Sequence, residues 1–395
     1  MTELKPETLI HRLADLELNL VADNSVRVFM EGGWIESGKH TFEILKAFAT
    51  PTPLQVGLRS IAAEGSEDYL VATATVKRLH ELGCLLTHKA RPFSTDRAFG
   101  NARVHISMLN DRARVDAYFA GLRAVVRPGD VVLDIGTGTG VLALAAAQAG
   151  ARRVYAIESG SMADVAQANF DASAYADRIT LIRGWSTQVE LPELADVVVS
   201  EIIGNDPLGE GVIPVILDAR KRLLKPGARY LPGRLRVLGL PVSIPGAELA
   251  KHLVSAGTLE TWREWYGTDF SPLKRLCHPD DRPLFYISPQ QARDWLELAD
   301  PVVLAEIDFA TFDDKSSSQS LDITSRATGM LNGLLVGFEL TLGPATLNTL
   351  PGSVSDANHW ESPVFYLSTT REVRRDERLV LSVDRTRNGW LLEYY

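Results

Sequence analysis

The chain has 395 residues, of which 45% are hydrophobic and 23% are charged. This length predicts two or three domains, and the composition is that of an ordinary globular protein. The net charge of −9 and the pI near 5.5 argue against a general nucleic-acid binder, which needs clustered Lys and Arg. An acidic chain is compatible with a cationic partner.

The two cysteines, Cys84 and Cys277, exclude a disulfide framework and a cysteine-based metal site. We expect no metal. The first residues, Met1 to Pro6, lack a basic and then apolar signal, and no apolar run of about 18 residues is present to span a bilayer. A cytoplasmic protein without membrane contact is therefore expected.

Residues 1–90 are predicted to form a small α+β module. Val26–Met30 and Trp34–Ile35 bracket Gly32 and Gly33, a pattern typical of a β-hairpin. Helical patterns follow, and the order of elements favours a winged-helix-like module. The predicted helices are Thr41–Ala49, Leu54–Ala63 and Asp68–Leu82.

Residues 91–233 alternate between strand and helix patterns, which is typical of a doubly wound parallel sheet, a Rossmann-like α/β domain. The strands are predicted at Val131–Asp134, Arg153–Glu158, Ile179–Ile182 and Asp196–Glu201, and the helices at Val141–Gly150 and Gly211–Leu224.

Residues 234–395 are β-rich, which predicts a β-barrel or β-sandwich domain. Asp313–Ser320 has the composition of a solvated loop. Strands are predicted at Val302–Phe309, Gly329–Leu342, Pro363–Leu367, Leu379–Val383 and Trp390–Tyr395.

A glycine run follows the first strand of the α/β domain. Asp134 ends the apolar segment, and Gly136, Thr137, Gly138 and Gly140 follow it. Glycines at these positions let the backbone approach a bound nucleoside closely. A dinucleotide loop is an alternative, but it prefers G-x-G-x-x-G, whereas the spacing here is G-x-G-x-G. A tight turn without a ligand is the other alternative.

Glu158 ends the next predicted strand, where its carboxylate can accept both ribose hydroxyls. A glycine turn that lies between Asp134 and Glu158 resembles the S-adenosylmethionine site of class I methyltransferases. The predicted cofactor is therefore S-adenosyl-L-methionine, with S-adenosyl-L-homocysteine as its product.

Glu201 and Glu210 bracket one loop at the end of the strand Asp196–Glu201. Ligands of open α/β sheets bind beyond the carboxyl ends of the strands, so this loop should face the methyl donor. Two carboxylates there can clamp a planar guanidinium bidentately. Alternatively, Glu210 only caps the helix that begins near Gly211.

A His-Trp pair, His359-Trp360, follows in the β-rich region, and the segment His105–Arg114 precedes the glycine loop. With the glycine loop and the two glutamates, these pieces make the chain from about Arg91 onward resemble the protein arginine methyltransferases. Taken singly, each has an ordinary alternative: a core histidine and tryptophan, a surface arginine, a core methionine.

The resemblance implies roles for individual residues. His105–Arg114 would form a helix in which Arg114 holds the carboxylate of the donor's methionine moiety and Met108 lies beside the sulfonium. Asp111 would pair with His359. His105 would also contact the cofactor. Trp262–Leu276 would lie near a dimerisation arm, so a homodimer is expected, with Gly257–Leu276 as the candidate arm.

Two departures from the family pattern affect the expected site. Arg91–Asn101 keeps the aromatic residues Phe93 and Phe99 but has no tyrosine, where the family has a Tyr-rich helix. The stretch from Gly184 to Gln188 lacks the family's adenine-contacting acid. Adenine recognition then falls to Ser186 or to its neighbours Thr187 and Gln188.

The chemistry expected from these residues is N-methylation of a guanidino group. Free L-arginine or a small arginine-like metabolite is favoured because Asn205 and Asp206 are available for its α-amino or carboxylate end. Bacterial relatives that methylate the internal nitrogen of free arginine for specialised metabolites make this a plausible resemblance. Trp360 is the remaining candidate substrate contact.

Two alternatives stay open. One is arginine methylation of a protein or of a leader-bearing peptide, because residues 22–88 resemble winged-helix modules that grip leader peptides by strand addition. The other is a non-catalytic binding protein that retains the methyltransferase fold.

Overall fold

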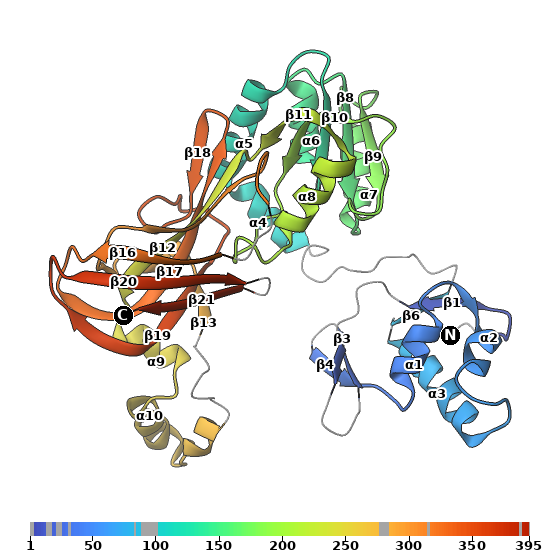
Figure 1. The fold of residues 1–395 in the computed structure, drawn as a ribbon, viewed down its shortest axis with the longest axis horizontal. Coiled ribbons are helices and arrows are strands. Elements are labelled where there is room, and N and C mark those ends of the chain that lie inside the picture. The colour runs from blue at the N-terminus through green and yellow to red at the C-terminus, as the bar shows by residue number, and fades with distance from the viewer. Residues whose placement is uncertain are drawn as a thin grey trace. The chain divides into compact units, whose positions relative to one another are not determined.

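The structure is a computed structural model, and it describes residues 4–12, 18–20, 26–30, 33–82, 84–87, 102–275, 284–313, 317–386 and 389–394. Two compact units divide the chain, residues 1–100 and residues 101–395 (Figure 1). Predictions for Gly32, Cys277 and the segment Arg91–Asn101 lie outside the described residues. The division into domains at 90 and 233 stays a prediction.

In its described residues, the first unit contains two small antiparallel sheets and three helices. One sheet has the order β5-β1-β6 and the other the order β2-β3-β4, so the predicted hairpin is confirmed as β3 paired with β4. The elements are β1 (Leu9–Arg12), β2 (Leu18–Leu20), β3 (Val26–Met30), β4 (Gly33–Glu36), α1 (Thr41–Ala47), β5 (Thr52–Pro53), α2 (Leu54–Arg59), α3 (Glu67–Glu81) and β6 (Leu85–Thr87).

The three helices pack around a separate core that includes Ile44, Phe48 and Leu79. The α3 helix begins where the sequence predicts it, because the Ser66 hydroxyl caps it by accepting from the Tyr69 amide at 3.2 Å. The α2 helix ends before the predicted Ala63. There the Ser60 hydroxyl donates to the Gly57 carbonyl at 2.6 Å, a local bond that competes with helix continuation.

The second unit begins with a five-stranded parallel sheet of order β11-β10-β7-β8-β9, which confirms the predicted Rossmann-like fold (Figure 1). The near-continuous apolar strands fit a sheet buried on both faces. Its elements are α4 (Ala102–Asn110), α5 (Arg112–Val125), β7 (Val131–Ile135), α6 (Val141–Gln148), β8 (Arg153–Glu158), α7 (Met162–Asp171), β9 (Ile179–Arg183), β10 (Ala195–Ser200), α8 (Val212–Arg222) and β11 (Leu224–Leu231).

The segment expected as one helix, His105–Arg114, is split at Asp111. Asp111 is the N-cap of α5, and its Oδ1 accepts a hydrogen bond from the Arg114 amide at 3.2 Å. An aspartate that satisfies a free amide in this way starts a new helix. The break leaves the other carboxylate oxygen of Asp111 available to the β-rich part of the unit.

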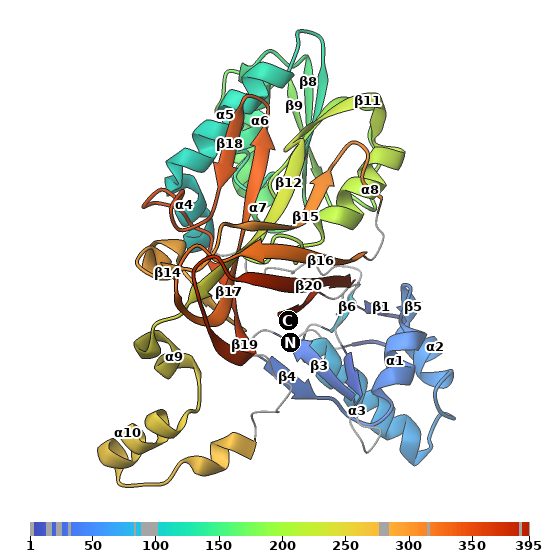
Figure 2. The same ribbon diagram turned by 60° about the vertical axis from the view of Figure 1, so that its left-hand side comes forward.

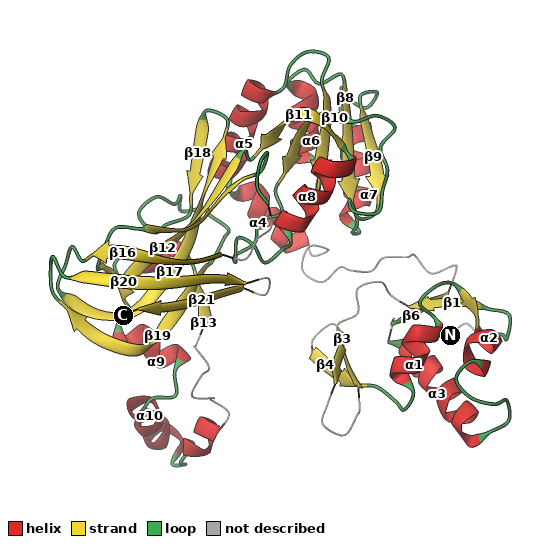
Figure 3. Ribbon diagram, in the orientation of Figure 1, coloured by secondary structure: helices red, strands yellow, loops and turns green. Residues whose placement is uncertain are grey.

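The β-rich part is antiparallel, as predicted, and its long strand β17 pairs with both β12 and β19 (Figure 3). The elements are β12 (Arg234–Ser243), α9 (Gly246–His252), α10 (Ala256–Tyr266), the short helix η1 (Ser271–Arg275), β13 (Leu284–Ile287), η2 (Pro289–Ala292), β14 (Leu296–Glu297), β15 (Val302–Asp308), β16 (Ser317–Thr324), β17 (Gly329–Leu342), β18 (Ala345–Asn348), β19 (Ser362–Val373), β20 (Arg378–Thr386) and β21 (Gly389–Tyr394).

The loop predicted at Asp313–Ser320 is wrong for its last four residues, because strand β16 begins at Ser317. The strand pairs with β20 at one edge of a three-stranded sheet. An edge strand tolerates serines, while Ile323 supplies a buried contact further along it. The polar composition of residues 317–320 is therefore compatible with an edge strand and does not require a loop.

The two layers of the second unit share one hydrophobic core, which contains Leu133 of β7 together with Leu235 of β12 and Leu340 of β17. Figure 2 shows β18 running alongside α5. A Cβ on Gly121 of α5 would lie 2.9 Å from the Leu342 carbonyl oxygen, so only glycine permits this approach. The shared core thus packs the β-rich part against α5, the helix that carries Arg114.

The α10 helix lies in the arm expected from the resemblance and exposes Trp265 and Tyr266. Within the described parts of the chain, no helix combines the length and the apolar character that a membrane crossing requires.

Candidate active site

The glycine loop joins β7 to α6 in a tight turn. Gly136 and Thr137 both donate their amides to the Ile157 carbonyl at 3.0 Å, and Gly140 is the N-cap of α6. Gly140 has a φ of 87°, and a Cβ there would lie 2.4 Å from the Phe170 ring. Only glycine fits this position, and the loop brings bare backbone to the carboxyl edge of the sheet.

Asp134 is completely buried below this loop, where its Oδ2 accepts the Thr137 hydroxyl at 2.6 Å. Burial raises the pKa of Asp134 to about 7. Its Oδ1 has no hydrogen-bond partner among the described residues. Asp134 therefore supports the loop from beneath.

Glu158 ends β8 beside the loop, as predicted. Its carboxylate accepts from the Gly138 amide at 2.9 Å and from the Gly160 amide at 2.7 Å. These bonds fix the carboxylate at the strand end where a ribose is expected.

Ser186 follows the neighbouring strand β9 and is buried, with its carbonyl oxygen accepting from Arg222 Nη2 at 2.8 Å. Thr187 and Gln188 are exposed. Arg222 thus anchors the stretch that was expected to recognise adenine, and the role of Ser186 stays a prediction.

Arg114 and Glu201 form a buried ion pair between Nη1 and Oε2 at the centre of the site. Arg114 Nη2 also donates to the Met108 carbonyl at 2.9 Å, which ties α5 to α4. Burial raises the pKa of Glu201, and the nearby charge of Arg114 opposes that rise. The residue expected to hold the donor and the residue expected to hold the acceptor are therefore in direct contact.

Glu210 closes the same loop, and its side chain packs on Gly204. A Cβ on Gly204 would lie 2.5 Å from Glu210 Oε1. Glu210 is exposed as a whole residue, but the enclosure of its carboxyl beside Gly204 and the neighbouring charge of Glu201 raise its pKa to about 7. The alternative that Glu210 caps α8 is not supported, because Gly211 is the N-cap and no side-chain cap bond forms.

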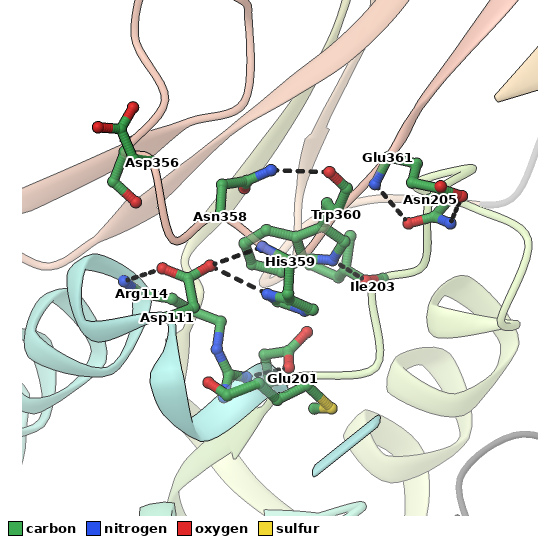
Figure 4. Close-up of polar contacts among 12 residues, drawn as sticks. Asp111, Arg114, Glu201, Ile203, Asn205, Asp356, Asn358, His359, Trp360 and Glu361 are labelled. Atoms are coloured by element: carbon green, nitrogen blue, oxygen red, sulfur yellow. Dashed lines mark hydrogen bonds and ion pairs between the residues drawn. The ribbon is translucent and has the colours of Figure 1, made fainter. Parts of the chain in front are cut away.

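His359 reaches this site from the β-rich part (Figure 4). Its Nδ1 lies 3.0 Å from Asp111 Oδ2, and its amide donates to the same oxygen at 3.3 Å. Burial raises the pKa of Asp111, but the hydrogen bonds from His359 and the Arg114 amide outweigh it, so the pKa falls below its ordinary value. The structure thus forms the Asp111–His359 pair that the resemblance implies.

Two family models match the chain. Residues 75–231 match the ribosomal protein L11 methyltransferase model, and residues 248–390 match the arginine methyltransferase oligomerization subdomain. Among solved structures, the *Trypanosoma brucei* PRMT1 enzyme-prozyme complex with AdoHcy has a TM-score of 0.64 at 24% identity, covering 75% of this chain and 95% of that one. *Arabidopsis thaliana* protein arginine methyltransferase 10 has a TM-score of 0.62 at 24% identity, covering 75% and 97%. These structures share the fold.

Curated relatives decide the family. The arginine N(omega)-methyltransferase of *Streptomyces achromogenes* subsp. *streptozoticus* is 32% identical over 296 residues, which are 73% of this chain and 76% of the relative. Protein arginine N-methyltransferase 6 of *Danio rerio* is 30% identical, covering 71% and 81%. The probable protein arginine N-methyltransferase 6 of *Arabidopsis thaliana* is 28% identical, covering 72% of this chain and 66% of its own length.

The chain belongs to the protein arginine methyltransferase family. It is a class I methyltransferase that uses S-adenosylmethionine, as the family does.

The residues of this methyltransferase fit that donor. A Cβ on Gly138 would lie 3.2 Å from the ring of His105, so glycine at this position allows that ring to lie close to the loop. Arg114 is buried, and its Nε has no hydrogen-bond partner among the described residues. A carboxylate on the donor would satisfy such a group. Met108 is half-buried on the same helix as His105.

Two residues of this methyltransferase that were expected to contact the substrate have hydrogen-bond partners within the protein. Trp360 is 3% exposed and donates its indole N–H to the Ile203 carbonyl at 2.7 Å. Asn205 bonds to Glu361 through both ends of its amide. Asp206 accepts the Leu208 amide at 3.2 Å and forms a turn, so its contact with a substrate stays a prediction.

Two residues of the site were missed by sequence reasoning. Glu361 directly follows the His-Trp pair, a position that could have drawn attention to it. Tyr118 is fully buried, and its hydroxyl donates to the Ser200 carbonyl at 3.3 Å, directly before Glu201. Tyr118 gave no signal because its hydrophobic neighbours mark it only as a core residue.

Proposed function

We propose that this methyltransferase transfers a methyl group to a guanidino nitrogen of arginine, held by Glu201 and Glu210. The observation that carries the proposal is the joint position of the two carboxylates in one loop at the end of β10, with Arg114 and the Asp111–His359 pair beside Glu201. Two carboxylates match the fork of a guanidinium, and Arg114 matches the donor's carboxylate.

A protonated guanidinium is a poor nucleophile because its lone pairs are delocalised. Glu201 and Glu210 would fix its plane and draw positive charge towards two of its nitrogens, which leaves the third aimed at the donor. The donor supplies an electrophilic methyl group on a sulfonium. Positioning is then the main catalytic effect. The proton that leaves after transfer would pass to a glutamate or to the Asp111–His359 pair.

Free L-arginine or a small guanidino metabolite is the acceptor that we propose first. The *Streptomyces* relative is named for arginine and not for a protein, which supports this choice. Asp206 lies in the loop between the two glutamates, where its carboxylate would meet an α-ammonium group. The name of the *Streptomyces* relative specifies the omega nitrogens, which are the terminal nitrogens of the guanidino group, so a terminal nitrogen is one candidate methylation site and the internal nitrogen is the other.

Arginine in a peptide is the second candidate, because the chain carries an additional unit. The relatives match 71–73% of the chain, and residues 1–100 form a compact unit of their own. In that unit, β1 is the central strand of its sheet, and β5 and β6 each leave one edge open in the described residues. Open strand edges bind extended peptides.

We also propose that the protein forms a homodimer through the arm. The exposed aromatic side chains Trp265 and Tyr266 lie on α10, inside the segment that matches the oligomerization subdomain. Neighbouring exposed aromatic groups are typical of a protein interface.

The test offers methyl-labelled S-adenosylmethionine to the purified protein with free L-arginine and, in parallel, an arginine-rich peptide. We expect label on free arginine, and mass spectrometry of the product identifies the methylated nitrogen. Label only on the peptide would support the second candidate. No label on either acceptor, with calorimetry showing that the donor binds, would contradict the proposed activity and favour a non-catalytic binding protein.

A further inference from the structure

The loop that carries both glutamates, residues 201–210, has neither helix nor strand. We call it the acceptor loop. Its first glutamate is held by Arg114, and its last directly precedes Gly211, the N-cap of α8. Between these ends the loop has to be fixed by other contacts, because the two carboxylates must keep a constant separation to hold a planar group.

Those contacts come from residues 358–361 of the β-rich part, which we call the barrel loop. The Trp360 indole donates to the Ile203 carbonyl at 2.7 Å, and the Asn358 amide closes the barrel loop on itself by donating to the Trp360 carbonyl at 2.7 Å. His359 belongs to the same loop and pairs with Asp111.

Asn205, midway along the acceptor loop, makes the second connection. Its Oδ1 accepts the Glu361 amide at 2.9 Å, and its Nδ2 donates to Glu361 Oε2 at 3.3 Å. Figure 4 shows this pair beside the Trp360–Ile203 bond, so the two loops are joined at neighbouring points. Each end of the Asn205 amide has a complementary partner on Glu361.

We infer that Asn205 and Glu361 are positioning residues that lock the acceptor loop to the barrel loop and thereby set the spacing between the two glutamates and His359. The catalytic part of this inference rests on the proposed function. Neither residue touches the donor or the guanidino group in this account.

The lock should affect turnover more than stability. Glu361 is exposed and Asn205 is half-buried, so their hydrogen bonds contribute little to folding. A displacement of about 1 Å at a reacting group, however, can cost on the order of 100-fold in rate. A merely structural role would lower the melting temperature without separating kcat from donor affinity.

An exchange of donor and acceptor tests the lock. Asn205→Asp places a carboxylate oxygen against Glu361 Oε2 and turns attraction into repulsion. Glu361→Gln keeps an acceptor for Asn205 and serves as the matched control. In the double variant Asn205→Asp/Glu361→Gln, the amide at position 361 donates to the carboxylate at position 205, so the bond returns with its direction reversed.

We expect Asn205→Asp to lower kcat about tenfold with the donor Kd within about twofold of wild type, and the double variant to recover to within about threefold. Amide hydrogen exchange in residues 201–210 should rise in the single variant and return in the double variant. Unchanged kcat or unchanged exchange in Asn205→Asp would overturn the inference. A double variant as slow as Asn205→Asp would also overturn it and would indicate that Asn205 touches the substrate.

Failure of the proposed function is a separate outcome. If the wild-type protein methylates neither free arginine nor the peptide, the proposed function is contradicted, while the exchange measurement still decides whether Asn205 and Glu361 lock the two loops.

Discussion

The contact between Arg114 and Glu201 joins the donor side of the site to the acceptor side. Both side chains are buried, and each neutralises the charge of the other. A buried charge without a partner is costly, so the contact lowers the cost of burying the two groups before either ligand arrives. When the ligands bind, the donor's carboxylate and the acceptor's guanidinium would provide the same charges from outside.

The first prediction concerns Glu201→Gln. This change removes the carboxylate that holds the guanidinium, and we expect kcat to fall about 100-fold or more. Donor affinity, measured by calorimetry, should persist because Arg114 stays in place and loses its competing anion. Glu361→Gln is the control and should keep near wild-type turnover. Full activity of Glu201→Gln would refute the role of this glutamate.

The second prediction concerns the pH dependence of acceptor binding. The pKa of Glu210 is raised to about 7 from an ordinary value of 4.5, so the folded protein binds this proton more tightly than the unfolded chain. The stability that the protonated Glu210 carboxyl contributes to the folded protein is therefore lost as pH rises from about 4.5 to about 7. A guanidinium favours the deprotonated form, so acceptor affinity should rise with pH up to about 7 and then level off.

Calorimetry in buffers of different ionisation enthalpy measures this effect, since acceptor binding below pH 7 should release a proton. Glu210→Gln should bind more weakly and lose the pH dependence. If Glu210→Gln keeps the wild-type pH profile, another group is responsible.

At the scale of elements, the sequence predicted four of the five strands of the parallel sheet and missed β11, which directly follows α8. Arg153–Glu158 and Gly329–Leu342 agree with β8 and β17 at both ends. Both strands are rich in apolar and β-branched or aromatic residues, so local patterns indicate them. The break at Asp111 was missed although its cap is local, since the aspartate accepts from the Arg114 amide three residues on. The strand from Ser317 could not be predicted, because it depends on pairing with β20, which is distant in sequence.

The residues of the site also fall into two groups, those that local sequence patterns indicate and those that depend on contacts distant in sequence. Glu158, Glu201 and Glu210 follow from strand ends, which sequence patterns locate. The Asn205–Glu361 contact joins residues that are 156 positions apart, and no local pattern specifies it. The partner of Asn205 was missed for this reason: the polarity of Asn205 was visible in the sequence, but Glu361 was not indicated as its partner.

The third prediction concerns the glycine loop. Gly140→Ala forces a Cβ to within 2.4 Å of the Phe170 ring at a φ of 87°. We expect a loss of about 2–4 kcal/mol in unfolding free energy and weaker donor binding. Gly129 has a similar φ of 92°, but a Cβ there would have no atom within 4 Å. Gly129→Ala therefore measures only the cost of the backbone conformation, about 1 kcal/mol. Chemical denaturation of both variants checks this, and equal losses would contradict the packing argument.

At the scale of the whole molecule, the chain combines a methyltransferase of known family with an additional N-terminal unit. The sequence indicated both parts, but it missed elements in each of them, among them β1, β11 and β12. It could not identify the acceptor, because the relatives include proteins named for arginine and for protein arginine. The choice between free arginine and arginine in a protein would depend on residues around the site and on the added unit.

The fourth prediction concerns assembly. Trp265 is 67% exposed on the arm, and Trp265→Glu places a charge in the proposed dimer contact. Sedimentation velocity should show a dimer for wild type and a shift to monomer for the variant. Leu70→Glu, at a leucine that is 66% exposed in the N-terminal unit, is the matched control and should leave the dimer intact. An unchanged dimer in Trp265→Glu would place the interface elsewhere.

The central claim is that the two glutamates present a guanidino group to the methyl donor. The most direct measurement is the transfer of labelled methyl from S-adenosylmethionine to free L-arginine by wild type and by Glu201→Gln, with the product resolved by mass spectrometry. The account predicts label on a guanidino nitrogen with wild type and its loss in the variant, with donor binding retained in both. Label on another group of arginine, or equal transfer by the two proteins, would contradict it.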